Sequence, residues 1–386
     1  MKVALIIPRY GPDIVGGAEY YARALAEKLN KYHHIEILTT CARDYHTWRN
    51  EYKDGIETIN DITVRRFKNA NERNINRLQK LEERVFYNIH NKDDELKWLQ
   101  DQGPYSIDLI KYIDENRNSY DCFIFFTFRY YPSYYGIGQV GYKSILVPFA
   151  ENDPALNLMT TESTFQAVKG IVYSTPEEKD LIEKKVIFNK EDKVWDMIGL
   201  GVEVPQGTEA PKQTYEYMLY MGRIDGSKGC YNLFENYLRA KKEIQNIPKL
   251  LLAGYAAIEI PKNKDIIYLG FIPEVEKYTL LKNAKFLIMP SPYESLSIVT
   301  LEAMATGVPV LVNGECDVLK GHCLRSNGGL WYQNYDEFVE CIKLLSSEEK
   351  LRNIMGDNGR RYIEANYSWV QVEKEYLELL DRFDNK

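Results

Sequence analysis

Short apolar runs alternate with amphipathic segments along this whole chain, and that alternation limits its fold more than any other feature. Runs such as Val3–Pro8 and Phe286–Met289 are long enough for a buried strand and too short for a buried helix. The stretches between them, such as Ala18–Leu29 and Cys230–Ile244, repeat apolar residues at helical spacing. Strands that alternate with helices form parallel sheets covered on both faces. The pattern therefore predicts an α/β fold built from β-α-β units.

The expected strands fall into two series. The first comprises Val3–Pro8, Ile35–Thr40, Ile62–Phe67, Cys122–Phe128, Ser144–Phe149, Gly170–Ser174 and Lys193–Ile198. The second comprises Tyr217–Met221, Leu250–Ala253, Ile266–Leu269, Phe286–Met289 and Val308–Val312. A chain of 386 residues is too long for one hydrophobic core, and Val202–Lys212, which contains two prolines, interrupts the pattern. We expect an N-terminal Rossmann-like domain (1–203), a C-terminal one (204–367) and a final helix (368–386) that packs back toward the first domain.

Composition excludes several classes of protein. A formal charge of −7 supplies no basic field for a polyanion, so we expect no nucleic-acid partner. The six cysteines form no Cys-x-x-Cys pair and the five histidines lack metal-ligand spacing, which predicts no metal and favours a reducing cytoplasm. The sequence contains no apolar run of about 18 residues, the length of a membrane span. One basic segment, Arg65–Lys80, is interpreted as a solvated loop and helix face, with membrane or acceptor contact as the alternative.

A glycine turn follows the first expected strand, in Tyr10–Glu19 (YGPDIVGGAE). Gly16 and Gly17 let the backbone approach a ligand closely and present helix N-terminal N–H groups to it. The turn is not Gly-x-Gly-x-x-Gly, so a hydride-transfer cofactor is not expected. The alternative is a tight strand-to-helix turn that needs glycine for geometry alone.

A second turn follows the first strand of the C-terminal series, in Gly222–Gly229 (GRIDGSKG). It places Arg223 and Lys228 at the carboxyl end of a strand. A planar guanidinium suits phosphate oxygens and an ammonium adds a point charge, so together they can hold and neutralise a diphosphate without a metal. The alternative is a solvated surface loop.

Two carboxylates lie in the segment Pro290–Ala305 (PSPYESLSIVTLEAMA), which comprises a third loop and the start of the helix after it. Glu294 comes just past a buried strand and can accept hydrogen bonds from sugar hydroxyls. The helix is expected to begin about Ser297, so backbone N–H groups at its start point toward an anion. Glu302, about one turn into the helix, can bind a ribose diol. The alternative is that both are ordinary first-turn acids that complement the helix dipole.

These motifs resemble the retaining glycosyltransferases of family four, the glycosyl transferases group 1. The two glutamates seven residues apart, with Pro-Ser before and Ala-Met-Ala-x-Gly-x-Pro-Val after them, carry the resemblance together with the two glycine turns. It covers nearly the whole chain and implies the GT-B fold, in which two Rossmann-like domains with parallel sheets face each other across a cleft. It implies that Arg223, Lys228 and Glu294 serve catalysis, with retention of configuration. The donor-binding residues that it implies are Gly16, Gly17, Arg223, Lys228, Glu294, Ser295, Leu296, Ser297, Ile298 and Glu302.

The chain departs from the family pattern at two places. Ser295-Leu296-Ser297 stands where relatives often have Gly-Phe-Gly, which keeps small residues near the phosphates and adds two hydroxyls. Ala150-Glu151-Asn152 stands where many relatives place a histidine that faces the reacting sugar. Either Glu151 or Asn152 takes over that contact, or the catalytic arrangement differs.

Acceptor binding falls to the first domain in this family. The segment Arg129–Tyr135 (RYYPSYY) follows an expected strand, and Tyr130 and Tyr131 can stack on sugar rings. The alternative is aromatic packing at a helix entry in a tyrosine-rich protein.

The residues and the resemblance together predict a metal-independent, retaining hexosyltransferase without a cofactor. It would move a sugar from a UDP- or GDP-sugar donor to a glycan or lipid-linked glycan acceptor in cell-surface polysaccharide synthesis. The expected location is the cytoplasm, and the resemblance leaves peripheral contact with the inner membrane face open. The alternatives are a non-catalytic sugar-nucleotide-binding subunit and an epimerase or phosphorylase on the same scaffold.

Overall fold

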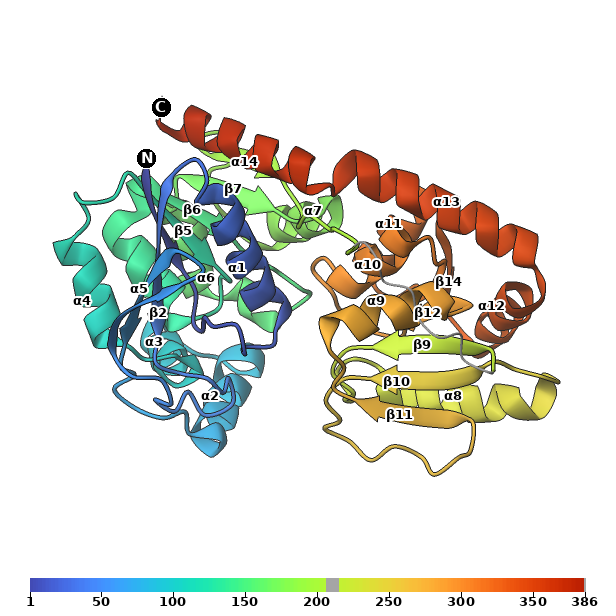
Figure 1. Cartoon of the computed structure of the whole chain (residues 1–386). Helices are drawn as coiled ribbons and strands as arrows, with labels where there is room; N and C mark the ends of the chain where they lie inside the picture. Colours follow the sequence, from blue (N-terminus) through green and yellow to red (C-terminus); the bar gives the residue numbers. More distant parts are fainter. Residues whose placement is uncertain (206–214, 385–386) are drawn as a thin grey trace. The chain divides into compact units, whose positions relative to one another are not determined.

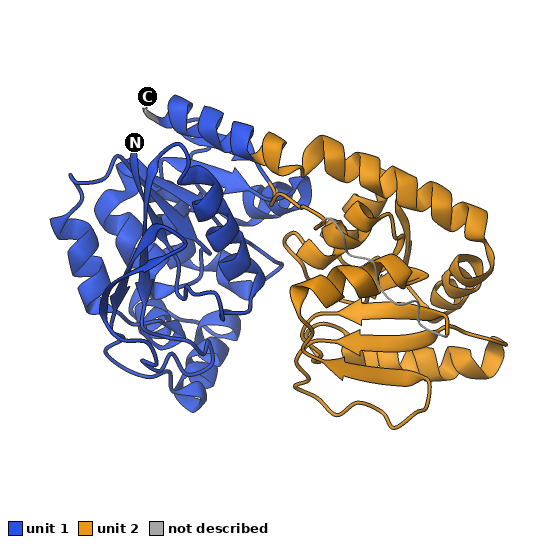
Figure 2. Cartoon of the chain, in the orientation of Figure 1, with its two compact units in different colours: residues 1–198, 373–386 blue, residues 199–372 orange. Residues whose placement is uncertain are grey.

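The computed structural model describes residues 1–205 and 215–384, which form two units (Figure 2). Unit 1 comprises Met1–Ile198 and Glu373–Lys386, and unit 2 comprises Gly199–Val372. The units divide after Ile198 and after Val372. The sequence instead predicts divisions after residues 203 and 367. The predicted linker lies outside the described residues from position 206 onward.

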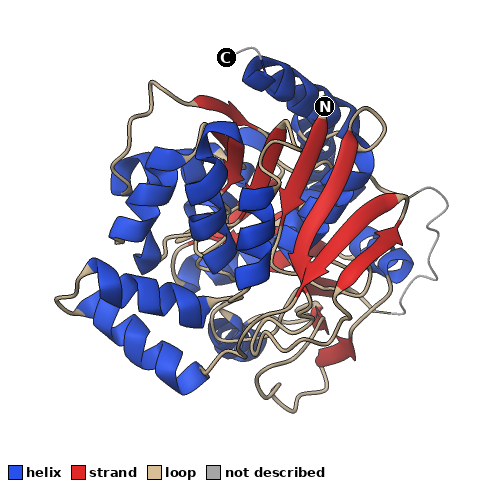
Figure 3. Ribbon diagram, turned by 90° about the vertical axis from the view of Figure 1, so that its left-hand side faces the viewer, coloured by secondary structure: helices blue, strands red, loops and turns tan. Residues whose placement is uncertain are grey.

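Unit 1 is built on an eight-stranded sheet in the order β3-β4-β2-β1-β5-β6-β7-β8 (Figure 1). The strands are β1 (Lys2–Ile6), β2 (His34–Thr40), β3 (Gly55–Ile59), β4 (Ile62–Phe67), β5 (Cys122–Phe126), β6 (Ser144–Val147), β7 (Gly170–Tyr173) and β8 (Val194–Met197). Every residue of β5 and β6 is buried, because these strands lie inside a sheet that helices cover (Figure 3).

One edge of the mostly parallel unit 1 sheet is antiparallel. Strand β3 was not predicted, and it pairs antiparallel with β4, whereas the other neighbouring strands of this sheet are parallel. The hairpin turns at Asn60 and Asp61, whose φ angles are 49° and 62°. A two-residue hairpin turn needs positive φ at both positions, which Asn and Asp tolerate better than most residues. This Asn-Asp pair was the signal for the missed strand.

Helices pack on the unit 1 sheet in the β-α-β manner that the sequence predicts. They are α1 (Gly17–Leu29), α2 (Ile75–Tyr87), α3 (Lys92–Gln102), α4 (Ile107–Glu115), α5 (Tyr131–Val140), α6 (Met159–Ala167) and α7 (Pro176–Lys185), with short 3-10 turns at Gly141–Lys143 and Pro154–Asn157. The last helix, α14 (Trp369–Asp384), begins in unit 2 and ends in unit 1. There the Tyr376 hydroxyl lies 2.7 Å from that of Tyr21 on α1, and Lys169 donates to the Phe383 carbonyl at 2.8 Å.

Unit 2 has a six-stranded sheet in the order β11-β10-β9-β12-β13-β14, with all its strand pairs parallel. Its strands are β9 (Tyr217–Met221), β10 (Lys249–Ala253), β11 (Ile266–Gly270), β12 (Phe286–Met289), β13 (Val310–Asn313) and β14 (Gly329–Tyr332). Its helices are α8 (Cys230–Glu243), α9 (Glu274–Asn283), α10 (Ile298–Thr306), α11 (Asp317–Ser326), α12 (Tyr335–Ser347) and α13 (Glu349–Asn366). Of these strands, only β14 is missing from the prediction.

Strand order places the candidate motifs within each unit. In unit 1 the chain builds outward from β1 to β4 on one side and then continues at β5 on the other. In unit 2 it builds from β9 to β11 and then continues at β12. Ligands of open α/β sheets bind at such reversals, beyond the carboxyl ends of the strands. The glycine turns after β1 and β9 both lie at a reversal.

Candidate active site

The turn after β9 holds its two cations in a hydrogen-bonded network. The Arg223 guanidinium pairs with the Asp225 carboxylate, and Asp225 Oδ1 also accepts from Ser227 Oγ at 2.7 Å and from the Lys228 backbone N–H at 2.9 Å. Burial opposes ionisation of Asp225, but these hydrogen bonds and the Arg223 charge outweigh it and lower the Asp225 pKa. The Asp225 carboxylate therefore links three groups of this turn.

The same turn lies against the end of β12, which brings two sequence motifs together. Gly229 has φ of 74°, and a Cβ there would lie 2.3 Å from the Pro290 carbonyl oxygen, so the close approach requires glycine. Next to it, Lys228 Nζ lies 2.8 Å from Glu294 Oε1. Both side chains are partly buried, with exposed fractions of 25% and 14%. A cation and a carboxylate that are 66 positions apart in the sequence thus share one place.

A buried histidine forms a hydrogen bond with the backbone of the loop before α10. His322 Nε2 lies 2.9 Å from the Leu296 carbonyl oxygen, and Nδ1 lies 3.1 Å from the Tyr362 hydroxyl. Burial lowers the His322 pKa to about 3, so its ring is neutral near pH 7 and donates through one nitrogen only. Nε2–H therefore donates to Leu296, and Nδ1 accepts from Tyr362. This bond fixes the loop that carries Glu294 and Ser295.

Helix α10 begins at Ile298, with Ser297 as its N-cap at φ of 61°. The first N–H groups of a helix have no intrahelical acceptor, and together with the helix dipole they attract an anion. Ser297 Oγ lies 2.9 Å from Thr300 Oγ1. Lys228 and the helix start therefore offer positive charge and N–H donors around the Glu294 loop.

Glu302 lies in the second turn of α10 and is 4% exposed. Its Oε1 lies 2.7 Å from Lys277 Nζ and accepts from the Tyr278 hydroxyl at 3.3 Å. Burial raises the Glu302 pKa, and the Lys277 charge opposes that rise. The interpretation of Glu294 and Glu302 as ordinary first-turn acids is wrong, because Glu294 precedes α10 and Glu302 lies in its second turn.

In unit 1 the glycine turn folds over a buried ion pair. The Arg9 guanidinium pairs with Glu19 in the first turn of α1 and donates to the Arg43 carbonyl at 2.9 Å. A Cβ at Gly16 would lie 2.0 Å from Glu19 Oε2, so glycine lets the turn pass over this carboxylate. Gly17 is the first residue of α1. The geometric alternative thus accounts for Gly16.

A cavity of about 380 Å³ opens beside this turn. Its lining is mostly charged and comprises Arg9, Asp13, Ile14, Val15, Arg43, Asp44 and Glu51. Asp13 and Arg43 form an ion pair across 2.8 Å, and both are more than a third exposed. The cavity is large enough for a sugar ring, and its charged groups can exchange hydrogen bonds with hydroxyls.

The loop after β6 carries the departure at Glu151. Asn152 Oδ1 accepts from Lys185 Nζ at 2.6 Å, and the Asp153 carboxylate pairs with Arg129. The Asp153 backbone N–H donates to the Glu151 carbonyl at 2.6 Å, which tightens the loop. Asn152, one of the two residues considered as a replacement for the histidine, thus binds the last residue of α7.

Tyr131 packs in the interior of unit 1. It is 6% exposed, and its ring centroid lies 4.9 Å from that of Tyr105 and 4.3 Å from that of Tyr135. Tyr130, the N-cap of α5, is half-buried and meets Trp48 edge to face at 5.6 Å. This packing favours the structural alternative for Tyr131 over acceptor stacking.

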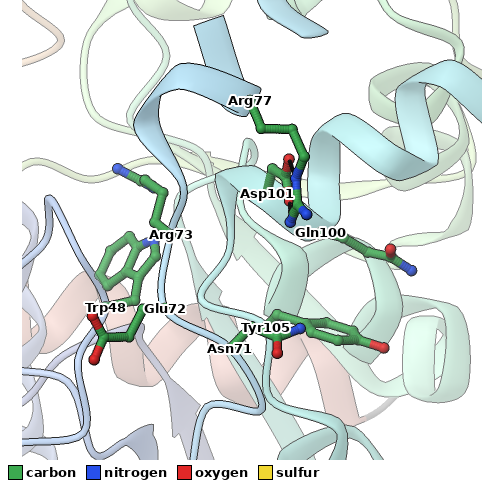
Figure 4. A pocket seen from close by; sticks show the side chains of 8 residues that line it. All are labelled: Trp48, Asn71, Glu72, Arg73, Arg77, Gln100, Asp101 and Tyr105. Carbon is green, nitrogen blue, oxygen red and sulfur yellow. Dashed lines mark hydrogen bonds and ion pairs between the residues drawn. The ribbon is translucent and has the colours of Figure 1, made fainter. Parts of the chain in front are cut away.

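A second cavity in unit 1 is too small for a sugar (Figure 4). Its volume is about 30 Å³, enough for one or two water molecules. Its lining comprises Trp48, Asn71, Glu72, Arg73, Arg77, Gln100, Asp101 and Tyr105. Arg73 lies over the Trp48 ring at 4.7 Å and donates to the Gln102 and Tyr45 carbonyls, and Arg77 pairs with the buried Asp101. The interpretation of this basic segment as a solvated face is therefore wrong for Arg73, which joins three loops.

Residues 206–362 match the sequence model of the family described as Glycosyl transferases group 1. Over these residues the chain belongs to this family of glycosyltransferases. Along almost its full length it is similar to the uncharacterized glycosyltransferase MJ1607 of Methanocaldococcus jannaschii, at 23% identity over 97% of this chain and 96% of that protein. It is also 25% identical to the capsular polysaccharide biosynthesis glycosyltransferase CapM of Staphylococcus aureus, over 43% of this chain and 47% of that one.

The glycosyltransferase has the GT-B fold. It superposes with a TM-score of 0.71 on the solved E. coli trehalose-6-phosphate structure bound with UDP-2-fluoro glucose, at 11% identity, covering 98% of this chain and 99% of that one. Binding of a nucleotide-sugar donor is typical of glycosyltransferases with this fold. Within the described residues, no helix of the glycosyltransferase combines the length and hydropathy needed to cross a membrane.

Sequence reasoning about this glycosyltransferase missed the residues that hold its candidate groups in place. Asp225 had a visible signal, because an acid between two cations in a turn is a natural partner for both. Lys277, His322 and Arg9 had none, since each reaches its partner through the fold. The motifs predicted the candidate groups themselves, and tertiary contacts supply their supports.

Proposed function

We propose that this glycosyltransferase is a metal-independent, retaining hexosyltransferase that uses a UDP- or GDP-sugar donor. The acceptor is a glycan or a lipid-linked glycan in cell-surface polysaccharide synthesis. The observation that carries the proposal is the contact of Lys228 with Glu294 beside the start of α10. A diphosphate needs cations and N–H donors, a sugar needs a hydrogen-bond acceptor, and this place in unit 2 offers all of them.

Each proposed donor contact follows from one of these groups. Arg223 and Lys228 bind the diphosphate, and the N–H groups at Ser295–Ile298 bind its oxygens. Glu294 accepts from the sugar hydroxyls and Glu302 from the ribose diol, and the Lys277 charge opposes the rise in the Glu302 pKa that burial causes. In transfer, the acceptor oxygen bonds to the anomeric carbon, the bond from that carbon to the diphosphate breaks, and the hydroxyl proton passes to the leaving diphosphate. Arg223 and Lys228 stabilise the charge that develops there.

We place the acceptor-binding site in unit 1. The 380 Å³ cavity beside the Gly16 turn is a suitable place for an acceptor sugar, because its lining is rich in charged hydrogen-bonding groups. Glu151 replaces the histidine contact of relatives, because it stands at about that place in the loop after β6. Similarity to the capsular polysaccharide glycosyltransferase of S. aureus supports the choice of pathway.

Thermal unfolding with UDP, GDP, ADP and their common sugar conjugates, in EDTA, tests the donor site. A ligand at a hundred times its Kd adds about 2.7 kcal/mol to the free energy of unfolding. One nucleotide should raise the melting temperature of the wild type and leave Glu302→Ala unchanged. Absence of a shift with every nucleotide would refute the proposal. A shift without donor hydrolysis or transfer to any acceptor would favour a non-catalytic binding subunit.

A further inference from the structure

One buried carboxylate joins two loops at the carboxyl edge of the unit 1 sheet. Glu178, in the first turn of α7, is 1% exposed. Its Oε1 accepts from the Ala150 N–H at 2.6 Å, and its Oε2 accepts from the Ser174 N–H at 2.6 Å. Ala150 lies in the loop after β6, and Ser174 follows β7. A buried carboxylate is costly, and both of its oxygens here bind backbone donors.

The loop after β6 needs such support. Phe149 has a φ of 48°, a left-handed conformation that is rare for a bulky residue and persists only where its surroundings hold it. Glu178 holds the next residue, Ala150, through its N–H. At the other end of α7, Lys185 holds Asn152. Helix α7 thus binds the loop on both sides of Glu151, and we call these two contacts, Glu178 with Ala150 and Lys185 with Asn152, the grip.

We propose that Glu178 is a positioning residue that holds the loop 149–152 and so sets where the Glu151 carboxylate stands during sugar transfer. The inference rests on the proposed function, because it takes Glu151 as the group that faces the reacting sugar. An ionised carboxylate accepts strongly at both oxygens, whereas the hydroxyl oxygen of a protonated acid accepts only weakly. The amide of glutamine turns an NH2 donor toward one of the two N–H groups and loses that hydrogen bond.

The carboxyl group of Glu178 is expected to ionise near neutral pH, whereas the phenols around it stay neutral. Burial, and next the Glu151 charge, oppose ionisation, and the Glu178 pKa rises to about 7. The other titratable groups that face it are Tyr173 of β7, Tyr21 of α1 and Tyr376 of α14. Burial raises the pKa of each of these phenols, so they stay neutral. The loop should therefore tighten as pH rises through about 7.

Hydrogen exchange tests the grip without any substrate. Glu178→Gln is compared with Glu95→Gln, a matched control in the same unit: Glu95 is fully buried and accepts from the Met159 and Thr160 N–H groups. In Glu178→Gln, the protection factors of amides 149–153 should fall at least about tenfold, the equivalent of about 1.4 kcal/mol. In Glu95→Gln they should change less than about twofold. Equal protection of this loop in wild type and Glu178→Gln would overturn the inference.

A second measurement needs no variant. Wild-type protection factors of amides 149–153, corrected for the intrinsic pH dependence of exchange, should rise between pH 6 and 8. A flat profile for amides 149–153 would also overturn the inference. This arm decides the question if Glu178→Gln fails to fold.

Donor hydrolysis then separates this inference from the proposed function. With the donor identified by thermal shift, kcat of the wild type should rise through pH 7, and kcat of Glu178→Gln should stay at the low-pH level with the donor KM unchanged. A loop that loosens while the kcat profile stays that of the wild type would refute the positioning role. Wild-type protein that neither binds nor hydrolyses any donor would refute the proposed function, and the exchange data would still report on the grip.

Discussion

Replacing Lys228 by alanine removes the cation that meets Glu294 at 2.8 Å. At this distance and an effective dielectric of about 20, the attraction is about 6 kcal/mol before desolvation is counted. The variant leaves a partly buried Glu294 carboxylate facing the place proposed for the diphosphate, where two negative charges repel. Loss of one donor to a developing oxyanion costs about 2.7–4 kcal/mol, so kcat should fall at least about a hundredfold. The donor KM should rise as well.

The matched control is Lys241→Ala. Lys241 pairs with Asp265 in the same unit, and the two side chains are 26% and 19% exposed, close to the values for Lys228 and Glu294. Both variants lose one partly buried ion pair, so their melting temperatures should fall by similar amounts. Single-turnover kinetics with the donor found by thermal shift measure the chemical step directly. Equal turnover in Lys228→Ala and Lys241→Ala would refute the role of Lys228 as a catalytic cation.

Three further predictions concern binding and stability. Glu302→Gln should bind the nucleotide at least about tenfold more weakly by calorimetry, because the amide cannot accept from both hydroxyls of a ribose diol; unchanged affinity would exclude ribose contact. Tyr21→Phe should lower the free energy of unfolding, measured in urea, by about 1–3 kcal/mol. The buried Tyr21 phenol donates to the Ile198 carbonyl at 3.0 Å and lies 2.7 Å from the Tyr376 hydroxyl. The control Tyr32→Phe, at an exposed tyrosine, should change the free energy of unfolding by less than about 0.5 kcal/mol. Burial raises the Glu178 pKa to about 7 against an ordinary 4.5, so its contribution to global stability is complete below pH 4.5 and is lost as pH rises to about 7, even though the ionised carboxylate binds the two loop N–H groups more strongly. The unfolding free energy of the wild type minus that of Glu178→Gln should therefore fall by up to about 1.4 kcal/mol per pH unit across that window, and a difference independent of pH would contradict it.

Most strands were predictable because their cause is local. A strand buried on both faces has to be apolar throughout, so β5 and β12 are visible as short runs with no help from the rest of the fold. The two missed strands lack that mark. The five residues of β3 are exposed or only partly buried, and the two central residues of β14 are only partly buried. The candidate donor groups were equally visible, because each motif lies within one turn or one loop and the helix after it.

The sequence by itself determined the fold class, the loops at the carboxyl ends of the strands and the residue types that can meet a diphosphate and a sugar. These depend on periodicity, glycine positions and short spacings, all of which act over a few residues. The tertiary structure alone decided the partners: Lys228 for Glu294, Lys277 for Glu302 and Glu178 for the loop that carries Glu151. These contacts join different secondary structure elements, and no local pattern specifies which cation or backbone N–H will lie within 3 Å of a given carboxylate once the sheets assemble.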